Sequence, residues 1–335
     1  MSEPRTPNDD LRALFADATS DIRPQGSLDE ILDRTTKVDP MTRRWFLPVV
    51  AAAAVIGFVI GGAVWIARDT NDTTGPTGTP TSNPTAGDGD VSASVPVYYV
   101  GATAHGTKLY REFERQQVCQ GGACLTLASA QAAVAGTPED PDYRNPWPAD
   151  TTVMTASYDG NILTLDLHIP WPEATGNGPK PSADEKLAVQ QLIYSAQAGL
   201  GKGRVPVQLL VDEAKVPVIL GVSTEAPLQA EDEADIVAPV QISSPGNRVI
   251  VPAGELKVSG VASAFEANVV WELLVGGDAV VQQGHATAQE CCKLAPYEFT
   301  IKDLQPGTYT IVVHDSDESG NGGPVNQDSK EIVVE

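Results

Sequence analysis

Three short stretches of this 335-residue chain hold side chains that could bind a ligand or react. Residues 140–148, DPDYRNPWP, combine Tyr143 and Trp147, whose rings could stack on a sugar or a partner peptide, with Arg144, which could pair with a carboxylate. The alternative is structural: both rings fold back against the edge of a sheet while the prolines fix the turn. This stretch is a candidate ligand or partner surface, with packing as the alternative.

The second stretch, residues 315–321 (DSDESGN), resembles the first half of a calcium-binding loop. Asp315, Asp317 and Ser319 would supply its oxygen ligands. Such a loop has a bidentate Glu at its twelfth position, where this chain has Asn326. The alternative is an acidic hairpin loop between two strands. Calcium is therefore a candidate with an incomplete ligand set, and no other cofactor is predicted.

The third group is the four cysteines. Cys119 and Cys124 are close enough in sequence to close a local loop with a disulfide. Cys291 and Cys292 are adjacent, and they could bond to each other or reach other partners. Four cysteines allow three connectivities, and the sequence does not choose among them. A zinc site is disfavoured because no His stands at ligand spacing from either pair.

Signatures of catalysis are absent from the sequence. It contains no G-x-S-x-G, H-E-x-x-H, P-loop or G-x-G-x-x-G string, and its four His are scattered. We therefore predict that the protein is not an enzyme. A peptidoglycan-acting hydrolase is the enzymatic alternative, since glycoside hydrolysis needs only two carboxylates and the chain has 44 acidic residues.

The element that places these groups is a run of 23 uncharged residues, Trp45 to Ala67. As a helix it would reach about 34 Å, enough to cross a hydrocarbon core of about 30 Å. Arg43 and Arg44 precede it, so residues 1–44 should be cytoplasmic and the rest extracytoplasmic. A cleavable signal peptide would have a shorter apolar region nearer the start. We predict an uncleaved single-pass anchor, and outside the cell disulfides can persist.

The net charge of −22 is unevenly distributed. Residues 1–44 carry 7 basic and 9 acidic side chains, whereas the residues after the run carry 15 and 35. Nucleic acid is therefore excluded as a partner, because binding it depends on cationic side chains that neutralise phosphates.

The chain after the anchor is expected to be multi-domain. Residues 68–94, rich in Thr, Pro and Gly, predict a flexible stalk. Residues 95–222 predict an α+β domain of order ββ-α-ββ-α-β with its helices on one face of a sheet. Within it, Asp159-Gly160 predicts a two-residue hairpin turn. Ser182 and Glu185 predict a capping box at the second helix.

Beyond this domain the pattern changes. Residues 223–239 are acidic, show no pattern beyond about one turn, and predict a linker. Residues 240–335 alternate in short strands separated by Gly, Pro and Asp turns, which predicts an all-β sandwich. Trp271 should pack in the core of that sandwich.

Both extracytoplasmic regions resemble known modules. Residues 95–222 resemble the GerMN domain of sporulation and spore-germination proteins, on the strings VYYV, LYREFER, DPDYRNPWP and DEKLAVQQLIYSA. Residues 240–335 resemble the immunoglobulin-like domain that accompanies it, on ISSPGNRVIVPAGELKVSGVASAFEANVVWEL and PYEFTI. The resemblance, to the membrane-anchored type found in actinobacteria, implies a non-catalytic envelope protein that self-assembles or binds cell-wall components.

Together these observations predict a membrane-anchored protein of the cell envelope. Its extracytoplasmic domains would bind a cell-wall component or an envelope protein, or self-associate. The first alternative is a single-pass sensor or regulator, in which residues 1–44 meet a cytoplasmic partner. The second is the hydrolase.

Overall fold

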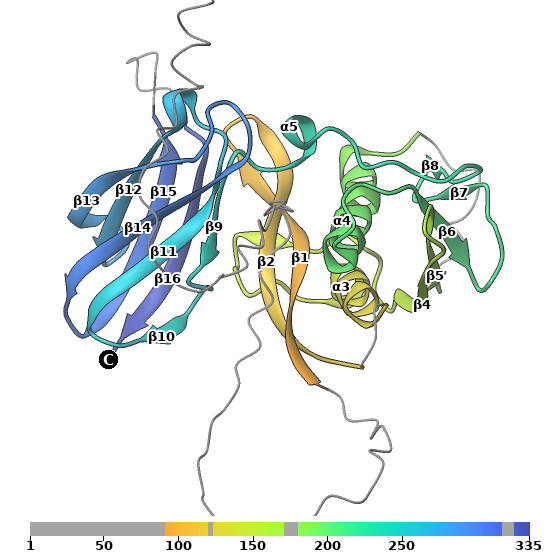
Figure 1. The fold of residues 1–335 in the computed structure, drawn as a ribbon, viewed down its shortest axis with the longest axis horizontal. Helices are drawn as coiled ribbons and strands as arrows, with labels where there is room; N and C mark the ends of the chain where they lie inside the picture. The colour runs from red at the N-terminus through yellow and green to blue at the C-terminus, as the bar shows by residue number, and fades with distance from the viewer. Residues whose placement is uncertain (1–90, 120–122, 171–179, 317–324) are drawn as a thin grey trace, which may run out of the picture. The chain divides into compact units, whose positions relative to one another are not determined.

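The structure is a computed structural model of the chain, and it describes residues 91–119, 123–170, 180–316 and 325–335 (Figure 1). The predicted cytoplasmic segment, the predicted membrane helix at 45–67 and nearly all of the predicted stalk lie outside them. Within the described residues, no helix is long and apolar enough to cross a membrane. These residues belong to one compact unit and are mostly β, with few helices.

The first domain begins with a long hairpin. β1 (Val91–Thr103) and β2 (Gly106–Val118) pair antiparallel along their whole length, and β3 (Tyr143–Arg144) pairs with the other side of β1. Residues 97–101 of β1 are all buried, so both faces of the strand are covered: Val97 and Tyr99 pack in one apolar cluster, and Tyr98 and Val100 pack in another. The strand starts inside the stretch predicted as stalk, because Val91 already pairs with Val118.

Local signals set the ends of the main helix, α4 (Ala183–Leu200). The Ser182 hydroxyl accepts a hydrogen bond from the Glu185 N–H at 3.2 Å, and the Glu185 carboxylate accepts one from the Ser182 N–H at 2.6 Å. The predicted capping box is therefore confirmed. The helix ends at Gly201, whose φ of 64° lies in the left-handed region that glycine adopts without steric cost. α3 (Cys124–Ala135) packs beside α4.

A second small sheet contains β4 (Thr152–Tyr158), β5 (Leu163–His168) and β6 (Val207–Val211), in the order β4-β5-β6. β5 and β6 are parallel. Parallel neighbours need a crossover connection, and α4 supplies it.

The predicted hairpin between β4 and β5 is confirmed, but its two-residue turn is wrong. The Asp159 carboxylate accepts hydrogen bonds from the N–H groups of Asn161 and Ile162, both at 2.8 Å. This Asx-type turn takes up four residues, so β5 begins at Leu163.

The helices do not cover one face of a single sheet, as the sequence pattern suggested. They lie between the two small sheets, as the first domain in Figure 1 shows. α3 makes this possible because it is rich in Ala and apolar on two sides. Ala130 and Val134 pack with β4–β6, whereas Ala132 and Ala133 pack with the β1–β2 hairpin.

The acidic segment predicted as a linker packs onto the first domain. Leu228 and Val207 exchange backbone hydrogen bonds of 2.7 and 2.8 Å. Further on, one helical turn, α5 (Glu233–Ile236), precedes Val237, which lies beside Leu109 of β2. A short hairpin of β7 (Val218–Ile219) and β8 (Val222–Ser223) leads into this segment.

The second domain is a two-sheet sandwich. One sheet has the order β10-β16-β15-β12-β13, and the other has the order β14-β11-β9. Their strands are β9 (Val240–Ser244), β10 (Val249–Val251), β11 (Gly254–Ala262), β12 (Asn268–Val275), β13 (Ala279–Thr287), β14 (Ala295–Leu304), β15 (Gly307–Asp315) and β16 (Gln327–Val334).

Side chains from both sheets fill a single core in the sandwich. Trp271 is buried there and stacks on Phe299, with ring centroids 4.9 Å apart. The predicted packing role of Trp271 is confirmed.

Candidate functional site

The two aromatic rings predicted for a ligand surface lie in the interior. Tyr143 is 7% exposed, and its hydroxyl donates a hydrogen bond of 2.6 Å to Asp328. Trp147 is 6% exposed, and its indole N–H donates to the Ala188 carbonyl at 2.9 Å. For these two residues the structure shows the packing alternative.

Arg144 is the exposed member of that predicted surface. Its guanidinium lies 2.6 Å from the carboxylate of Asp184, in the first turn of α4. Both side chains are about half exposed, so solvent screens the pair and its contribution to stability is small. The structure therefore separates Arg144, at the surface, from Tyr143 and Trp147, inside.

Tyr143 belongs to a buried set of polar groups that we call the polar junction: Asp140, Tyr143, Asp328 and Lys330. Asp140 and Tyr143 come from the first domain, and Asp328 and Lys330 come from β16 of the sandwich. The Lys330 ammonium lies 2.5 Å from Asp140, 2.9 Å from the Tyr143 hydroxyl and 3.8 Å from Asp328. It also lies 4.3 Å from the centre of the Tyr143 ring.

Charge in the polar junction is balanced partly by neutral donors. Lys330, Asp140 and Asp328 each have side chains only 3% exposed, so one ammonium faces two carboxylates away from water. Burial raises the pKa of Asp328, and the attraction of Lys330 and the hydrogen bond from Tyr143 oppose that shift. The N–H of Ile242 donates a further bond to Asp328 at 2.6 Å. Burial and Asp328 also raise the pKa of Tyr143, which keeps its hydroxyl protonated as a donor.

A glycine makes room for the ring of Tyr143. That ring stacks on Tyr110, with centroids 4.7 Å apart. Gly101 lies against both rings, and a β-carbon there would come within 2.7 Å of Tyr110 and 2.9 Å of Tyr143. A larger residue at this position would displace the stacked pair, because real β-carbons do not approach so closely.

Glu112 on β2 lies beside the polar junction, on its first-domain side. Its carboxylate accepts hydrogen bonds of 2.9 Å from the N–H groups of Glu139 and Asp140. Burial raises the pKa of Glu112 to about 7, against the opposing effects of those bonds and of Lys330. A carboxyl group next to the polar junction therefore titrates near neutral pH.

Gln241 of β9 makes a second polar contact with the first domain. Its side-chain oxygen accepts a hydrogen bond of 2.9 Å from the N–H of Arg111 on β2. Its amide N–H donates to the Ala238 carbonyl, also at 2.9 Å. The polar junction and the Gln241 contacts hold strands of the two domains in one relative position.

A cavity of about 360 Å³ lies where the end of β2 meets α3. The disulfide between Cys119 and Cys124 forms part of its wall. The remaining wall is mixed, with Gln117 and Gln131 beside Leu127 and several Ala. Sequence reasoning missed this cavity, although the closely spaced cysteines marked its position.

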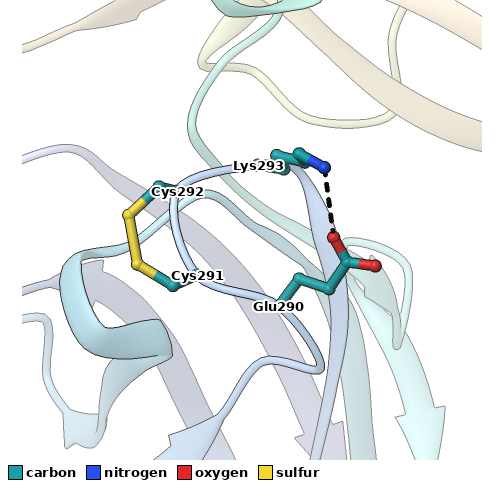
Figure 2. Close-up of a disulfide and its surroundings, with 4 residues drawn as sticks. All are labelled: Glu290, Cys291, Cys292 and Lys293. Carbon is teal, nitrogen blue, oxygen red and sulfur yellow. Dashed lines mark ion pairs between the residues drawn. A yellow bond between two sulfur atoms is a disulfide. The ribbon is translucent and has the colours of Figure 1, made fainter.

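Both disulfides join cysteines that are close in sequence. Cys119 bonds to Cys124, and Cys291 bonds to its neighbour Cys292 (Figure 2). Of the three connectivities left open by the sequence, the structure has the local one.

Asp315 is the one described member of the predicted calcium set, since Asp317 and Ser319 lie outside the described residues. Its carboxylate accepts hydrogen bonds from the backbone N–H and the side-chain amide of Asn326, at 2.9 and 2.8 Å. Over the part of the chain that the structure describes, no group of three or more acidic, His or Cys side chains could hold a metal ion. The calcium loop stays a prediction.

Two protein-family models match the chain. The model described as "Sporulation and spore germination" matches residues 96–217, and the model described as "Immunoglobulin-like domain of bacterial spore germination" matches residues 239–322. The resemblance to these two modules is therefore confirmed. Asp328 and Lys330 lie beyond the end of the second match, at residue 322.

Solved structures give weaker similarity. The tandem GerMN domains of the sporulation protein GerM from Bacillus subtilis align over 64% of this chain and 62% of that chain, with 15% identity and a TM-score of 0.31. A candidate lipoprotein from Clostridium perfringens aligns over 46% of this chain and 95% of its own, with 20% identity and a TM-score of 0.28. Scores this low carry no argument, so the assignment depends on the family models. No curated protein matches the chain.

Proposed function

Because the chain carries a sporulation and spore germination domain followed by an immunoglobulin-like domain of bacterial spore germination, we propose that it is a non-catalytic protein of the cell envelope. The apolar run at 45–67 would anchor it in the membrane. Its two folded domains would bind a cell-wall component or another envelope protein, or assemble with further copies.

The structural observation that supports a binding role is the polar junction. A buried Lys330 between Asp140 and Asp328 ties the two domains in one arrangement, since separating them would expose or unpair these charges. Domains held in this way present two surfaces at a fixed spacing. Binding then needs no ordering of a hinge, which favours recognition of an extended partner.

The negative charge of the chain after residue 67 limits which kinds of partner it can bind. The chain after residue 67 carries 35 acidic and 15 basic side chains, so its field repels polyanions. A neutral or cationic surface, such as a glycan strand or a basic protein, fits better than an anionic polymer.

The test uses the full chain in detergent micelles. Isolated cell wall and membrane extract are each incubated with the chain, and the bound fraction is measured by sedimentation and pull-down. We expect retention on one of them and no release of soluble wall fragments. Retention on neither would contradict binding to the wall or to an envelope partner and would favour self-assembly. Release of wall fragments would favour the hydrolase.

Two variants sharpen this test. Arg144→Ala removes the exposed member of the predicted ligand surface, and lower retention would show that this surface takes part. Deletion of residues 1–44 separates a scaffold from a sensor: a scaffold keeps its envelope function without them, and a sensor with a cytoplasmic partner does not.

A further inference from the structure

The loop between β13 and β14 carries a disulfide between consecutive residues, Cys291 and Cys292 (Figure 2). Both cysteines are exposed. The bond closes a small ring that includes the peptide unit between them, so it restricts the backbone directly.

The ring holds a backbone shape that the chain would not favour alone. Cys292 has a φ of 65°, in the left-handed region that residues other than glycine seldom adopt. Its N–H makes only a long hydrogen bond, 3.4 Å, to the Ala264 carbonyl. Glu290 and Lys293 form an exposed ion pair of 3.6 Å across the ring, which solvent screens. Opening the ring therefore removes the covalent constraint on the tip of this loop, while the hydrogen bond of 3.0 Å from the Gln289 N–H to the Pro296 carbonyl still closes its base.

Leu294 gives this constraint a consequence beyond the loop. It is partly buried and packs against an apolar cluster that includes Tyr98 of β1, Tyr194 of α4 and Ile236 of α5. Of the described residues in that cluster, Leu294 alone comes from the sandwich. We call this packing the Leu294 contact. The ring of Cys291 and Cys292 thus lies directly before a side chain that joins the two domains.

The other disulfide is placed differently. Cys124 begins α3 and is partly buried against a core cluster of the first domain. Only its partner Cys119 is exposed. Both residues of the Cys291–Cys292 bond are exposed, whereas only one residue of the Cys119–Cys124 bond is, so the first bond offers a reductant the more open approach.

We propose that the Cys291–Cys292 disulfide is a thiol–disulfide exchange site for a dithiol reductant, and that its reduction releases the Leu294 contact. This inference goes beyond the proposed function and does not depend on the identity of any wall or envelope partner.

The exchange is balanced by the dithiol alone. One thiolate of the reductant attacks a sulfur of the ring, the sulfur–sulfur bond breaks, and a mixed disulfide and a free cysteine thiolate form. The second thiol of the reductant then displaces the remaining cysteine sulfur. The reductant becomes a disulfide, while Cys291 and Cys292 take up two electrons and two protons.

The first experiment measures which bond opens. The oxidised full chain is titrated with dithiothreitol, free thiols are blocked with iodoacetamide, and peptides are quantified by mass spectrometry. Cys291 and Cys292 should be alkylated at dithiothreitol concentrations about tenfold lower than Cys119 and Cys124. Simultaneous alkylation, or earlier alkylation of Cys119 and Cys124, would overturn the proposal.

The second experiment measures the consequence by hydrogen exchange. Partial reduction should speed exchange in the segments around Leu294, Tyr98 and Ile236. The double variant Cys291→Ser/Cys292→Ser should show that faster exchange without reductant, and Cys119→Ser/Cys124→Ser should keep the response. Unchanged exchange on opening of the ring would contradict the proposal.

One further variant guards against misfolding of the serine variants. Leu294→Ala keeps the ring but removes the side chain, so exchange around Tyr98 and Ile236 should be fast when oxidised and no faster when reduced. A continued response of those segments to dithiothreitol in this variant would show that the ring acts by another route.

Discussion

Two of the contacts that join the folded domains have opposite chemistry. The polar junction encloses Lys330 with Asp140 and Asp328, whereas the Leu294 contact is apolar and follows an exposed disulfide. Buried charges are costly to desolvate and stabilise only a complete arrangement. An apolar side chain can leave its cluster for a smaller cost. The polar junction therefore fixes the relative position of the two domains, whereas the Leu294 contact can be released.

The largest expected effect comes from breaking the polar junction. Lys330→Met leaves Asp140 and Asp328 buried without their cation, and we expect it to lower the free energy of unfolding by about 3–5 kcal/mol. Chemical denaturation at pH 7 measures this change.

A matched triple variant tests the cause. Lys330→Met together with Asp140→Asn and Asp328→Asn removes all three charges, and it should recover much of the lost stability. If Lys330→Met alone costs less than about 1 kcal/mol, the value typical of exposed pairs, the polar junction is not a compensated set of buried charges.

Ionisation of Glu112, beside the polar junction, should make the free energy of unfolding depend on pH. Its pKa is raised from 4.5 to about 7 by burial, so the folded state binds a proton that the unfolded state releases between those values. Its contribution to the free energy of unfolding is therefore most favourable below pH 4.5 and falls by about 2–3 kcal/mol as the pH rises to 7 and above.

Glu112→Gln keeps an acceptor for one of the two N–H groups of Glu139 and Asp140, at a cost in stability that does not vary with pH, and it cannot ionise. Relative to the unmodified chain, it should become more stable as the pH rises from 4.5 to 8. Urea denaturation at several pH values measures the difference, and parallel curves for the two proteins would contradict the assignment.

The Leu294 contact should matter less. We expect Leu294→Ala to lower the free energy of unfolding by about 1–2 kcal/mol, below the usual value for a fully buried Leu because this side chain is only partly buried. Val281→Ala is a matched control, since Val281 is 52% exposed and its truncation should have almost no effect. Thermal and chemical denaturation measure both variants, and a loss for Leu294→Ala that exceeds the loss for Lys330→Met would reverse the order of the two contacts.

The smallest effect is expected at the exposed pair of Arg144 and Asp184. Arg144→Ala should cost less than about 1 kcal/mol, because each side chain is about half exposed and screened by solvent. A double-mutant cycle with Asp184→Ala isolates the pair from the favourable position of Asp184 in the first turn of α4. A coupling energy above about 2 kcal/mol would show that this exposed pair contributes as much to stability as buried charges do.

Features set by neighbouring residues could be predicted from the sequence. The capping box of Ser182 and Glu185 spans one helical turn, and the alternation around Trp271 reports which face of a strand is buried. The placement of α3 between two sheets could not be predicted, because an Ala-rich helix has no single apolar face that shows what it packs against.

The polar junction lay beyond sequence reasoning because its partners are distant. Tyr143 and Asp328 are 185 positions apart, and a carboxylate is stable in the interior only where such partners meet it. One signal was present. Asp328 and Lys330 alternate with Ile332 and Val334 on the buried face of β16, so the period of the strand already directed two charges inward.

The start of β1 has a mechanical consequence. Val91 is the first residue of the hairpin and pairs with Val118, directly before the disulfide of Cys119 and Cys124 that joins the end of β2 to α3. Tension applied to the chain ahead of Val91 would first pull on the outer rungs of this hairpin. The disulfide beside those rungs would hold the end of β2 against α3, so β2 would keep its place while the β1–β2 pairing carries the load.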